Sequence, residues 1–229
     1  MKKTVLITGG TGGIGGACLD LLHKNGWEIY APVRNIKTAD RLLELPHVYV
    51  EEIDFTNQQK LNDYCIRLMK HIPSLTLVAL LAGGRGPNKE FFDEDFPGSS
   101  KEEKVRNAIE GHKEASVLTK KRMLSAIVHS YRPVLKDTVL ATVGSHAADF
   151  SDELALEYDE IGYATSMKGV REVVADYKQY FGSVVFHEPG LVRTGLTKDK
   201  LAFALNDPKN KKQEADEYAL EFLTKTGLL

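Results

Sequence analysis

The residues best suited to chemistry form a glycine-rich run near the N-terminus. Residues 4–16 are Thr-Val-Leu-Ile-Thr-Gly-Gly-Thr-Gly-Gly-Ile-Gly-Gly. Val5–Ile7 is typical of a buried strand, and apolar residues at helical spacing follow from Ala17 until Asn25-Gly26. A strand, a tight turn and a helix in this order expose backbone N–H groups at the helix N-terminus, where the helix dipole also favours an anion. This arrangement can bind a pyrophosphate.

A flexible loop is the alternative interpretation of so many glycines. Glycine also lets a ligand approach the backbone, because no Cβ lies in the way. The strand and the helix that flank the run favour the phosphate site over the flexible loop.

Composition bounds the class of protein. The chain has 229 residues and a formal net charge of −2, which predicts one domain over residues 1–229 and argues against nucleic acid or an anionic membrane as the main partner. No apolar run approaches the roughly 20 residues that span a bilayer, and Met1-Lys2-Lys3 leaves no room for a signal peptide before the first strand. With Cys18 and Cys65 as free buried thiols, we expect a cytoplasmic protein.

The glycine-rich run must be positioned by the elements around it, and these alternate between strands and helices. Alternation of this kind predicts an α/β fold with a single doubly wound parallel sheet, joined by right-handed crossovers. The expected strands are Val5–Ile7, Trp27–Val33, His47–Ile53, Leu75–Ala82, Val134–Val143 and Val184–His187. Between and after them, the expected helices are Ala17–Lys24, Thr38–Leu45, Asn57–His71, Lys101–Tyr131 (one or two segments), Tyr163–Phe181, Asp199–Leu205 and Lys211–Lys225.

Two long polar segments, residues 83–100 and 144–161, interrupt this alternation as expected loops. The first contains the acidic cluster Asp93-Glu94-Asp95. Loops of such length are uncommon unless they cover a site, although a mobile surface excursion is the alternative. We expect both to lie over the carboxyl ends of the strands and to shape a substrate pocket.

The order of these features resembles the short-chain dehydrogenase/reductase family over almost the whole chain. Thr8-Gly9-x-x-x-Gly13-x-Gly15 matches the family's cofactor motif. The same residues satisfy Thr8-Gly9-x-x-Gly12-x-x-Gly15, the form found in the extended and atypical branches, so the motif does not choose the branch. The resemblance implies a Rossmann fold that binds NAD(P).

Further motifs of the family follow in the same order along the chain. Asp54-Phe55-Thr56 stands where the family has an acidic residue at the adenine, and Ala82-Gly83 matches the end of its Asn-Asn-Ala-Gly motif. Ser145 and Tyr163 match the catalytic serine and tyrosine, and Pro189-Gly190-x-x-x-Thr194 matches the turn beside the nicotinamide. The resemblance also implies a homodimer through helices 101–131 and 163–181.

The sequence departs from the family at several positions. The family motif is Tyr-x-x-x-Lys, but Met167 stands four residues after Tyr163, and Lys168 lies about 100° further round the helix. Leu80 and Leu81 replace both asparagines of the strand motif, and Gly111 or His112 stands where a helix asparagine is expected. Because the chain stops at Leu229, we expect six parallel strands in place of seven.

Arg34 bears on the choice of cofactor. It follows the second strand, and Val33 occupies the position at which an NAD-preferring member carries an acidic residue. A guanidinium can pair with a 2′-phosphate, so we predict NADP(H), with NAD(H) as the alternative cofactor and a solvated arginine as the alternative role. The expected cofactor-binding residues are Thr8, Gly9, Thr11, Gly12, Gly13, Ile14, Gly15, Arg34, Asp54, Phe55, Ala82, Gly83, Gly84, Pro189, Gly190, Val192 and Thr194.

Tyr163 and Ser145 together could act on a carbonyl group. Serine would hydrogen-bond the oxygen, and tyrosine would give or take the proton. A lysine ammonium about 5 Å from a tyrosine stabilises the phenolate by on the order of 3 kcal/mol, and Met167 supplies no such charge. Reduction needs the neutral phenol, so it is the favoured direction. Packing of Tyr163 against a bound dinucleotide without chemistry is the alternative.

Other candidate residues carry less weight. His112 and His146 are candidate replacement proton donors, while His187 is expected to pack in the sixth strand. The run Lys120-Lys121-Arg122 is interpreted as a solvated helix face, too short for a nucleic-acid patch. No spacing of histidine, cysteine or carboxylate residues indicates a metal site.

Two functions therefore remain open. The first is an NADPH-dependent reductase of a small-molecule carbonyl (or a dehydrogenase of the corresponding alcohol), with Tyr163 as proton donor and Ser145 polarising the substrate. The second is a catalytically silent NADP(H)-binding sensor or scaffold of the same fold. The absent lysine and asparagines favour the second function. Tyr163, Ser145 and the turn at Pro189-Gly190 favour the first.

Overall fold

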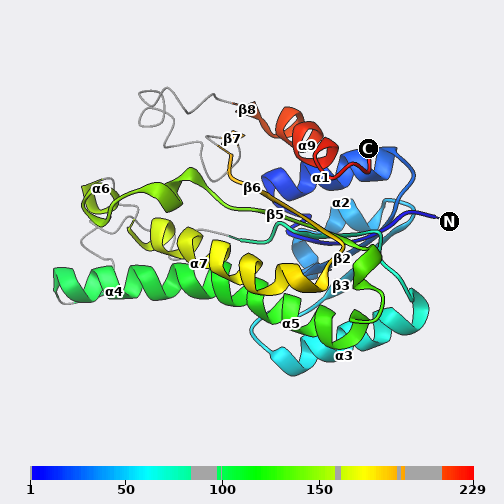
Figure 1. Cartoon of the computed structure of the whole chain (residues 1–229), viewed down its shortest axis with the longest axis horizontal. Coiled ribbons are helices and arrows are strands. Elements are labelled where there is room, and N and C mark those ends of the chain that lie inside the picture. Colours follow the sequence, from blue (N-terminus) through cyan, green and yellow to red (C-terminus); the bar gives the residue numbers. More distant parts are fainter. Residues whose placement is uncertain (1, 84–96, 99, 158–160, 190–191, 194–212) are drawn as a thin grey trace.

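The centre of the molecule is a six-stranded, fully parallel sheet (Figure 1). A computed structural model describes residues 2–83, 97–98, 100–157, 161–189, 192–193 and 213–229. The strand order is β3-β2-β1-β4-β5-β6, as expected for a doubly wound Rossmann-type sheet. The strands are β1 (Thr4–Thr8), β2 (Glu28–Val33), β3 (Val48–Glu52), β4 (Leu77–Leu80), β5 (Val139–Val143) and β6 (Ser183–His187).

Helices cover both faces of the sheet, so the strands are buried on two sides. On one face lie α1 (Gly13–Lys24), the short α2 (Asp40–Leu43) and α9 (Ala215–Thr224). On the other lie α3 (Gln58–His71), α5 (Thr119–Tyr131) and α7 (Ile161–Tyr177) (Figure 1). Within β1, Leu6 joins the core under α3, α5 and α7, while Val5 and Ile7 join the core under α1 and α9. Alternation of side chains along a strand explains this division.

The long helical stretch at 101–131 consists of three consecutive helical segments. It comprises α4 (Lys101–His112), the π-helical segment η2 (Lys113–Leu118) and α5 (Thr119–Tyr131). The wider turn is also marked by Thr119, whose hydroxyl donates to the carbonyl of Glu114, five residues earlier, at 3.0 Å. A π-helical turn contains an extra residue and therefore rotates the following helix face relative to the preceding one.

Several expected boundaries are corrected by the structure. The strand expected at Val134–Val143 begins only at Val139, because η3 (Leu135–Asp137) forms a 3-10 turn before it. The helix expected at Thr38–Leu45 is the pair η1 (Ile36–Thr38) and α2, and the helix expected from Tyr163 begins at Ile161. It ends in the 3-10 turn η5 (Lys178–Tyr180).

The segment 144–161 was expected to be a loop, and this expectation is wrong in part. It contains the 3-10 turn η4 (His146–Asp149) and the helix α6 (Asp152–Glu157). The turn η4 is capped by Ser145, whose hydroxyl accepts a hydrogen bond from the Ala147 amide at 3.2 Å.

Two predicted segments cannot be compared with the structure, and one small sheet was not predicted. Most of the expected loop 83–100, with its acidic cluster, and the helix expected at Asp199–Leu205 lie outside the described residues. A second small sheet, which the sequence did not predict, pairs β7 (Val192–Arg193) in parallel with β8 (Gln213–Glu214). Across the described ranges, no helix has the length and apolar character needed to cross a bilayer.

Candidate functional site

The sheet has its topological switch point between β1 and β4. From β1 the chain builds β2 and β3 on one side, and then returns to build β4, β5 and β6 on the other. In such sheets the ligand crevice lies at the carboxyl ends of the two strands that flank the switch. The glycine-rich turn follows β1, and Ala82-Gly83 follows β4, so these residues lie at the carboxyl ends of the two strands that flank the switch point.

Two glycines of the turn are required by backbone contacts. Gly9 has a φ of +80°, and a Cβ there would lie 2.7 Å from the Ala82 nitrogen. A Cβ on Gly15 would overlap the carbonyl group of Gly9. The Gly12 amide donates to the Gly9 carbonyl at 2.9 Å, which closes the turn. Close packing of β1, the turn and α1 therefore explains these glycines.

The N-terminus of α1 has the properties of an anion site. Gly12 is its N-cap and provides no side-chain hydrogen bond, and the first turn has no acidic residue. The first amides of a helix have no intrahelical acceptor and lie at the positive end of the dipole. Thr11, Gly12 and Gly13 are exposed, and Ile14 is partly buried, so the turn is open to a ligand.

Thr8 joins the end of β1 to the residues that follow β4. Its side chain is buried, and its hydroxyl accepts a hydrogen bond from the Ala82 amide at 3.1 Å. The Leu81 amide donates to the Thr8 carbonyl at 3.2 Å. These bonds hold the ends of β1 and β4 together beneath the glycine-rich turn.

Two polar residues extend the site along the ends of β2 and β3. Arg34 is exposed directly after β2, and Asp54 is exposed after β3, whereas Phe55 is buried in the core. The Asp54 carboxylate accepts from the Thr56 hydroxyl at 2.6 Å and from the Thr56 amide at 2.9 Å, which lowers the pKa of Asp54. Asp54 therefore remains an ionised hydrogen-bond acceptor at this edge.

The candidate catalytic residues lie on two elements that pack together. Ser145 precedes η4, which packs against α7, and Tyr163 lies in the first turn of α7. Tyr163 is partly buried, and its ring meets the ring of His112 edge to face, with centroids 6.1 Å apart. Gly162 permits this approach, because a Cβ there would lie 2.5 Å from the His112 ring.

The positions after Tyr163 lie as the helical spacing predicts. Met167 is buried in the core, while Lys168 is partly exposed, and its ammonium contacts the Asp152 carboxylate at 3.2 Å. The helix α7 is α-helical throughout Ile161–Tyr177, so no bulge turns Lys168 toward the Tyr163 face. Lys168 instead ties α7 to α6.

An ion-pair cluster holds the elements around the candidate catalytic residues. The Arg171 guanidinium of α7 donates to both oxygens of Glu188, at 2.6 and 2.7 Å, and to Asp149 at 2.9 Å. Glu188 directly follows β6, and Asp149 ends η4. Hydrogen bonding to these carboxylates raises the pKa of Arg171. The cluster thereby joins α7 to the segments that carry Ser145 and Pro189.

The remaining sequence-predicted residues divide into three groups. Gly84, Gly190 and Thr194 lie outside the described residues, and Val192 begins β7. Pro189 is partly buried after β6. His187 does pack in β6, where its ring stacks on Tyr218 and its Nδ1 lies 3.1 Å from the Tyr218 hydroxyl.

Lys120 does not lie where the sequence predicts. The run 120–122 is not a solvated face: Lys120 is buried, and its ammonium donates to the Ala82 carbonyl at 2.6 Å. Arg122 is half-buried in an ion pair with Glu114, and only Lys121 is fully exposed. The helical spacing did carry a signal, because Lys120 shares a face with the buried Ser116, Leu124 and Ile127.

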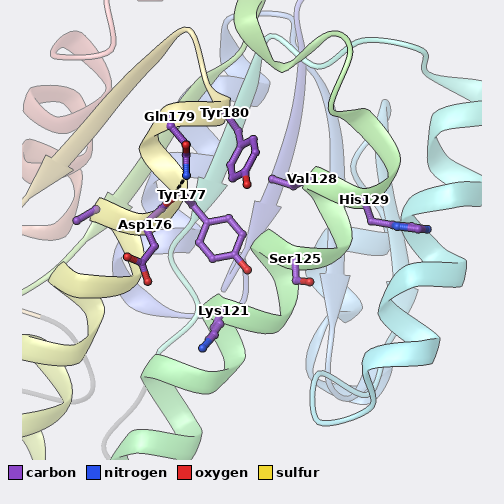
Figure 2. Close-up of a pocket in the computed structure, with 9 residues that line it drawn as sticks. Lys121, Ser125, Val128, His129, Asp176, Tyr177, Gln179 and Tyr180 are labelled. Atoms are coloured by element: carbon purple, nitrogen blue, oxygen red, sulfur yellow. Dashed lines mark hydrogen bonds between the residues drawn. The ribbon is translucent and has the colours of Figure 1, made fainter.

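A surface pocket of about 710 Å³ lies elsewhere, between α5 and the end of α7 (Figure 2). Tyr177 and Tyr180 point toward α5, where Lys121, Ser125 and His129 line the other side. Fourteen residues of helix separate Tyr163 from Tyr177, or about 20 Å at 1.5 Å per residue. This pocket is therefore separate from the crevice at the switch point.

Comparison with known proteins decides the family. A model of the short chain dehydrogenase family matches residues 3–126, which is more than half of the chain. The chain belongs to the short-chain dehydrogenase family. The family consists of oxidoreductases that act on small molecules, and the matched region contains β1 to β4, the glycine-rich turn, α4 and most of α5.

Solved structures show the same fold at low sequence identity. An alcohol dehydrogenase from Thermococcus sibiricus, complexed with 5-hydroxy-NADP, has a TM-score of 0.73 at 19% identity over 100% of this chain and 92% of its own. A short chain dehydrogenase from Burkholderia cenocepacia J2315, in complex with NADP, has a TM-score of 0.69 at 19% identity, covering 99% and 84%. A ribose-5-phosphate isomerase from Brucella melitensis 16M also reaches 0.73, at 13% identity over 99% and 88%. These likenesses concern the fold.

One curated relative matches only a short stretch. The "Putative quinone oxidoreductase YhfP" of Bacillus subtilis (strain 168) is 43% identical over 44 residues. That stretch is 19% of this chain and 13% of the relative, so the chain spans a small part of that protein's length.

We predict that Gly15→Ala destabilises the protein by about 3 kcal/mol, because the new Cβ overlaps the Gly9 carbonyl. Urea unfolding measures the change. Gly12→Ala is the matched control, because its Cβ would lie 3.3 Å from the same oxygen and needs only a small adjustment. Equal stability of the Gly15 variant and the wild type would contradict the packing role of Gly15.

We predict that Arg171→Met destabilises the protein by about 2 kcal/mol, because it leaves Glu188 without its two charge-assisted hydrogen bonds. Arg67→Met removes an exposed pair with Glu51 and should cost less than about 1 kcal/mol. Thermal unfolding of both variants measures the difference. Losses of the same size would show that the Arg171 cluster is no more than an ordinary surface ion pair.

Proposed function

We propose that the protein is an NADP(H)-dependent oxidoreductase that reduces a small-molecule carbonyl compound, with Tyr163 as the proton donor. The observation that carries this proposal is the uncapped N-terminus of α1 at the switch point of the sheet, in a chain whose residues 3–126 match the short chain dehydrogenase family. Tyr163 lies in the first turn of α7. Residues 1–229 act as one NAD(P)-binding domain in this proposal.

The residues at the crevice fit a nicotinamide dinucleotide. The first-turn amides of α1 and the glycine-rich turn can hold its diphosphate, and Asp54 offers an acceptor to the adenine. Arg34 can pair with the 2′-phosphate that distinguishes NADP from NAD. Two proteins of the same fold were solved with NADP or 5-hydroxy-NADP, which supports this choice. When bound as NADPH, the cofactor supplies the hydride.

The protein's own groups then orient the carbonyl and supply the proton. The Ser145 hydroxyl accepts from the Ala147 amide, so its proton remains available for donation to a carbonyl oxygen. A phenol is neutral at pH 7 and can serve as the acid of a reduction. Because Met167 stands four residues after Tyr163 on α7 and Lys168 pairs with Asp152, α7 brings no ammonium toward Tyr163 to favour the phenolate. Reduction is therefore the proposed direction.

The lack of an α7 ammonium beside Tyr163 also favours a second function. A protein that lacks the α7 lysine beside its tyrosine could bind NADP(H) as a sensor or scaffold without turnover. Leu80 and Leu81, in place of polar residues at the end of β4, point the same way. The two functions share the binding site and differ only in the chemistry at Tyr163.

Location and assembly complete the proposal. Cys18 and Cys65 are free and buried, which suits a reducing cytoplasm. A homodimer through the helical layer of α4, α5 and α7 would follow the family pattern, and light scattering after size exclusion tests it. A mass of one chain would remove the dimer without affecting the enzymatic proposal.

We expect Tyr163→Phe to abolish NADPH oxidation with a panel of aldehydes, ketones and quinones while leaving NADPH binding unchanged. The phenol supplies the proton, and the ring alone supplies the packing against His112. Tyr177→Phe, on the same helix but about 20 Å away, is the control. NADPH binding without turnover by the wild-type protein would favour the silent sensor.

We expect Arg34→Ala to weaken NADP(H) binding by roughly tenfold to a hundredfold with little change for NAD(H), because only NADP(H) carries the 2′-phosphate. Lys37→Ala removes an exposed positive charge a few residues further on and serves as the control. Titration calorimetry with both cofactors measures the effect. An equal loss for NADP(H) and NAD(H) would contradict the role of Arg34.

A further inference from the structure

Lys120 is a buried cation beside the residues that follow β4. Its side chain is 4% exposed, and its ammonium donates to the Ala82 carbonyl at 2.6 Å. A Cβ built on Gly83 would lie 3.2 Å from the same ammonium and 3.7 Å from the Ser116 hydroxyl. The lysine of α5 therefore reaches the end of β4 directly below residues that border the switch point.

The π-helical segment η2 directly precedes the first turn of α5, which carries Lys120. An extra residue in a helical turn rotates everything after it by about 100° relative to an unbroken α-helix. Lys120 lies two residues after η2 ends, on the face shared by the buried Ser116 and Leu124. Without the π turn, the residues of α5 would be rotated differently relative to the buried face of α4. Such turns are frequent at functional sites.

Lys120 is linked to the glycine-rich turn through the carbonyl and the amide of Ala82. The Ala82 carbonyl accepts from Lys120, while the Ala82 amide donates to Thr8 and lies where a Cβ on Gly9 would be. The backbone of one residue, Ala82, thus lies between the Lys120 ammonium and the glycine-rich turn. The Lys120 ammonium would therefore attract an anion bound at the N-terminus of α1.

Burial of this ammonium is unfavourable in the protein as described. Loss of hydration lowers the pKa of Lys120 to about 8. Among the residues that the structure describes, no carboxylate forms an ion pair with it. A buried cation without a counter-ion reduces stability, and an apolar side chain of the same length would pack there without that cost.

The charged groups on the elements packed around Lys120 have partners of their own. Arg122 of α5 pairs with Glu114 of η2, and Lys168 of α7 pairs with Asp152. After β3, Asp54 accepts hydrogen bonds from Thr56. The compensating negative charge for Lys120 can therefore come from a ligand in the crevice.

We propose that Lys120 is a charge-providing residue of the dinucleotide site, whose ammonium below Ala82-Gly83 stabilises the negative charge of a bound nicotinamide dinucleotide. The inference rests on the proposed function in one respect only, namely that such a dinucleotide occupies the crevice. It holds equally for the reductase and for the silent sensor. Lys120 supplies from α5 a positive charge that α7, with Lys168 turned to Asp152, does not bring to the site.

The protonation of Lys120 gives the proposal a pH signature. With a pKa of about 8, the ammonium is largely charged at pH 7 and is lost as the pH rises through 8 to 9. A bound anion favours the charged form and raises this pKa, so dinucleotide binding takes up a proton in that range. Affinity should therefore be level below pH 7 and should fall between pH 7.5 and about 9.

The first experiment compares the binding of NADPH and of NADH to the wild type, Lys120→Met, Lys120→Gln and Lys121→Met by titration calorimetry. Loss of a buried positive charge near the bound anion predicts a roughly tenfold to thirtyfold loss of affinity for both cofactors in both Lys120 variants. Lys120→Gln keeps a donor for Ala82, so it separates the charge from the hydrogen bond. Lys121→Met removes an exposed charge from the same helix and should bind as the wild type.

The second experiment measures proton uptake by calorimetry at pH 8.5 in two buffers of different ionisation enthalpy. The wild type should take up about 0.5–0.7 protons per dinucleotide more than Lys120→Met, because a tenfold to thirtyfold preference for the charged form raises a pKa near 8 by about 1 to 1.5. Equal uptake and equal affinity in the wild type and Lys120→Met would overturn the inference. Absence of any dinucleotide binding by the wild type would instead overturn the proposed function.

Unfolding without ligand completes the test. The folded-state pKa of Lys120 lies below the ordinary lysine value, so its burial penalty is fully present below pH 8 and is relieved as the pH rises toward 10.5. Lys120→Met should therefore melt at the same temperature or roughly 2–4 °C higher at pH 7, with the difference shrinking at pH 10. A lower melting temperature at pH 7, with unchanged binding, would assign Lys120 a structural role only.

Discussion

The close approach of two backbones, at the end of β1 and the end of β4, is the constraint on which the site depends. Gly9 and Ala82 are so near that no side chain fits on Gly9, and Gly15 is pressed against the Gly9 carbonyl in turn. Thr8 secures the same junction with hydrogen bonds to β4. Because the junction is built from main-chain groups, the amides of α1 open at a defined place above the switch point.

Electrostatics at this junction are arranged toward an anion. The helix N-terminus, exposed Arg34 and buried Lys120 all contribute positive potential, while no acidic residue occupies the first turn of α1. These contributions differ in their effect on stability. The helix N-terminus and Arg34 are exposed to water, whereas Lys120 has lost its hydration by burial, which is unfavourable for the charged form. A residue that weakens the unliganded fold and lies at a ligand crevice is more readily explained by binding than by stability.

The candidate catalytic residues depend on contacts from several elements. Ser145 is oriented by capping η4, and Tyr163 by the ring of His112 across Gly162. Arg171 joins α7, η4 and the end of β6 through Glu188 and Asp149. The site can therefore be positioned firmly although the usual lysine of the family motif is replaced by Met167 within the core.

Local patterns in the sequence predicted six strands, their parallel pairing and the glycine-rich turn, because apolar periodicity and glycine spacing act over a few residues. The order of the strands came from the structure. Only the tertiary structure decided how the charged residues are used. Lys120 is buried with its ammonium on the Ala82 carbonyl, and Lys168 forms an ion pair with Asp152 of α6. The sequence also did not predict the helix α6 or the β7–β8 pair, and β7 pairs with a strand distant in the chain.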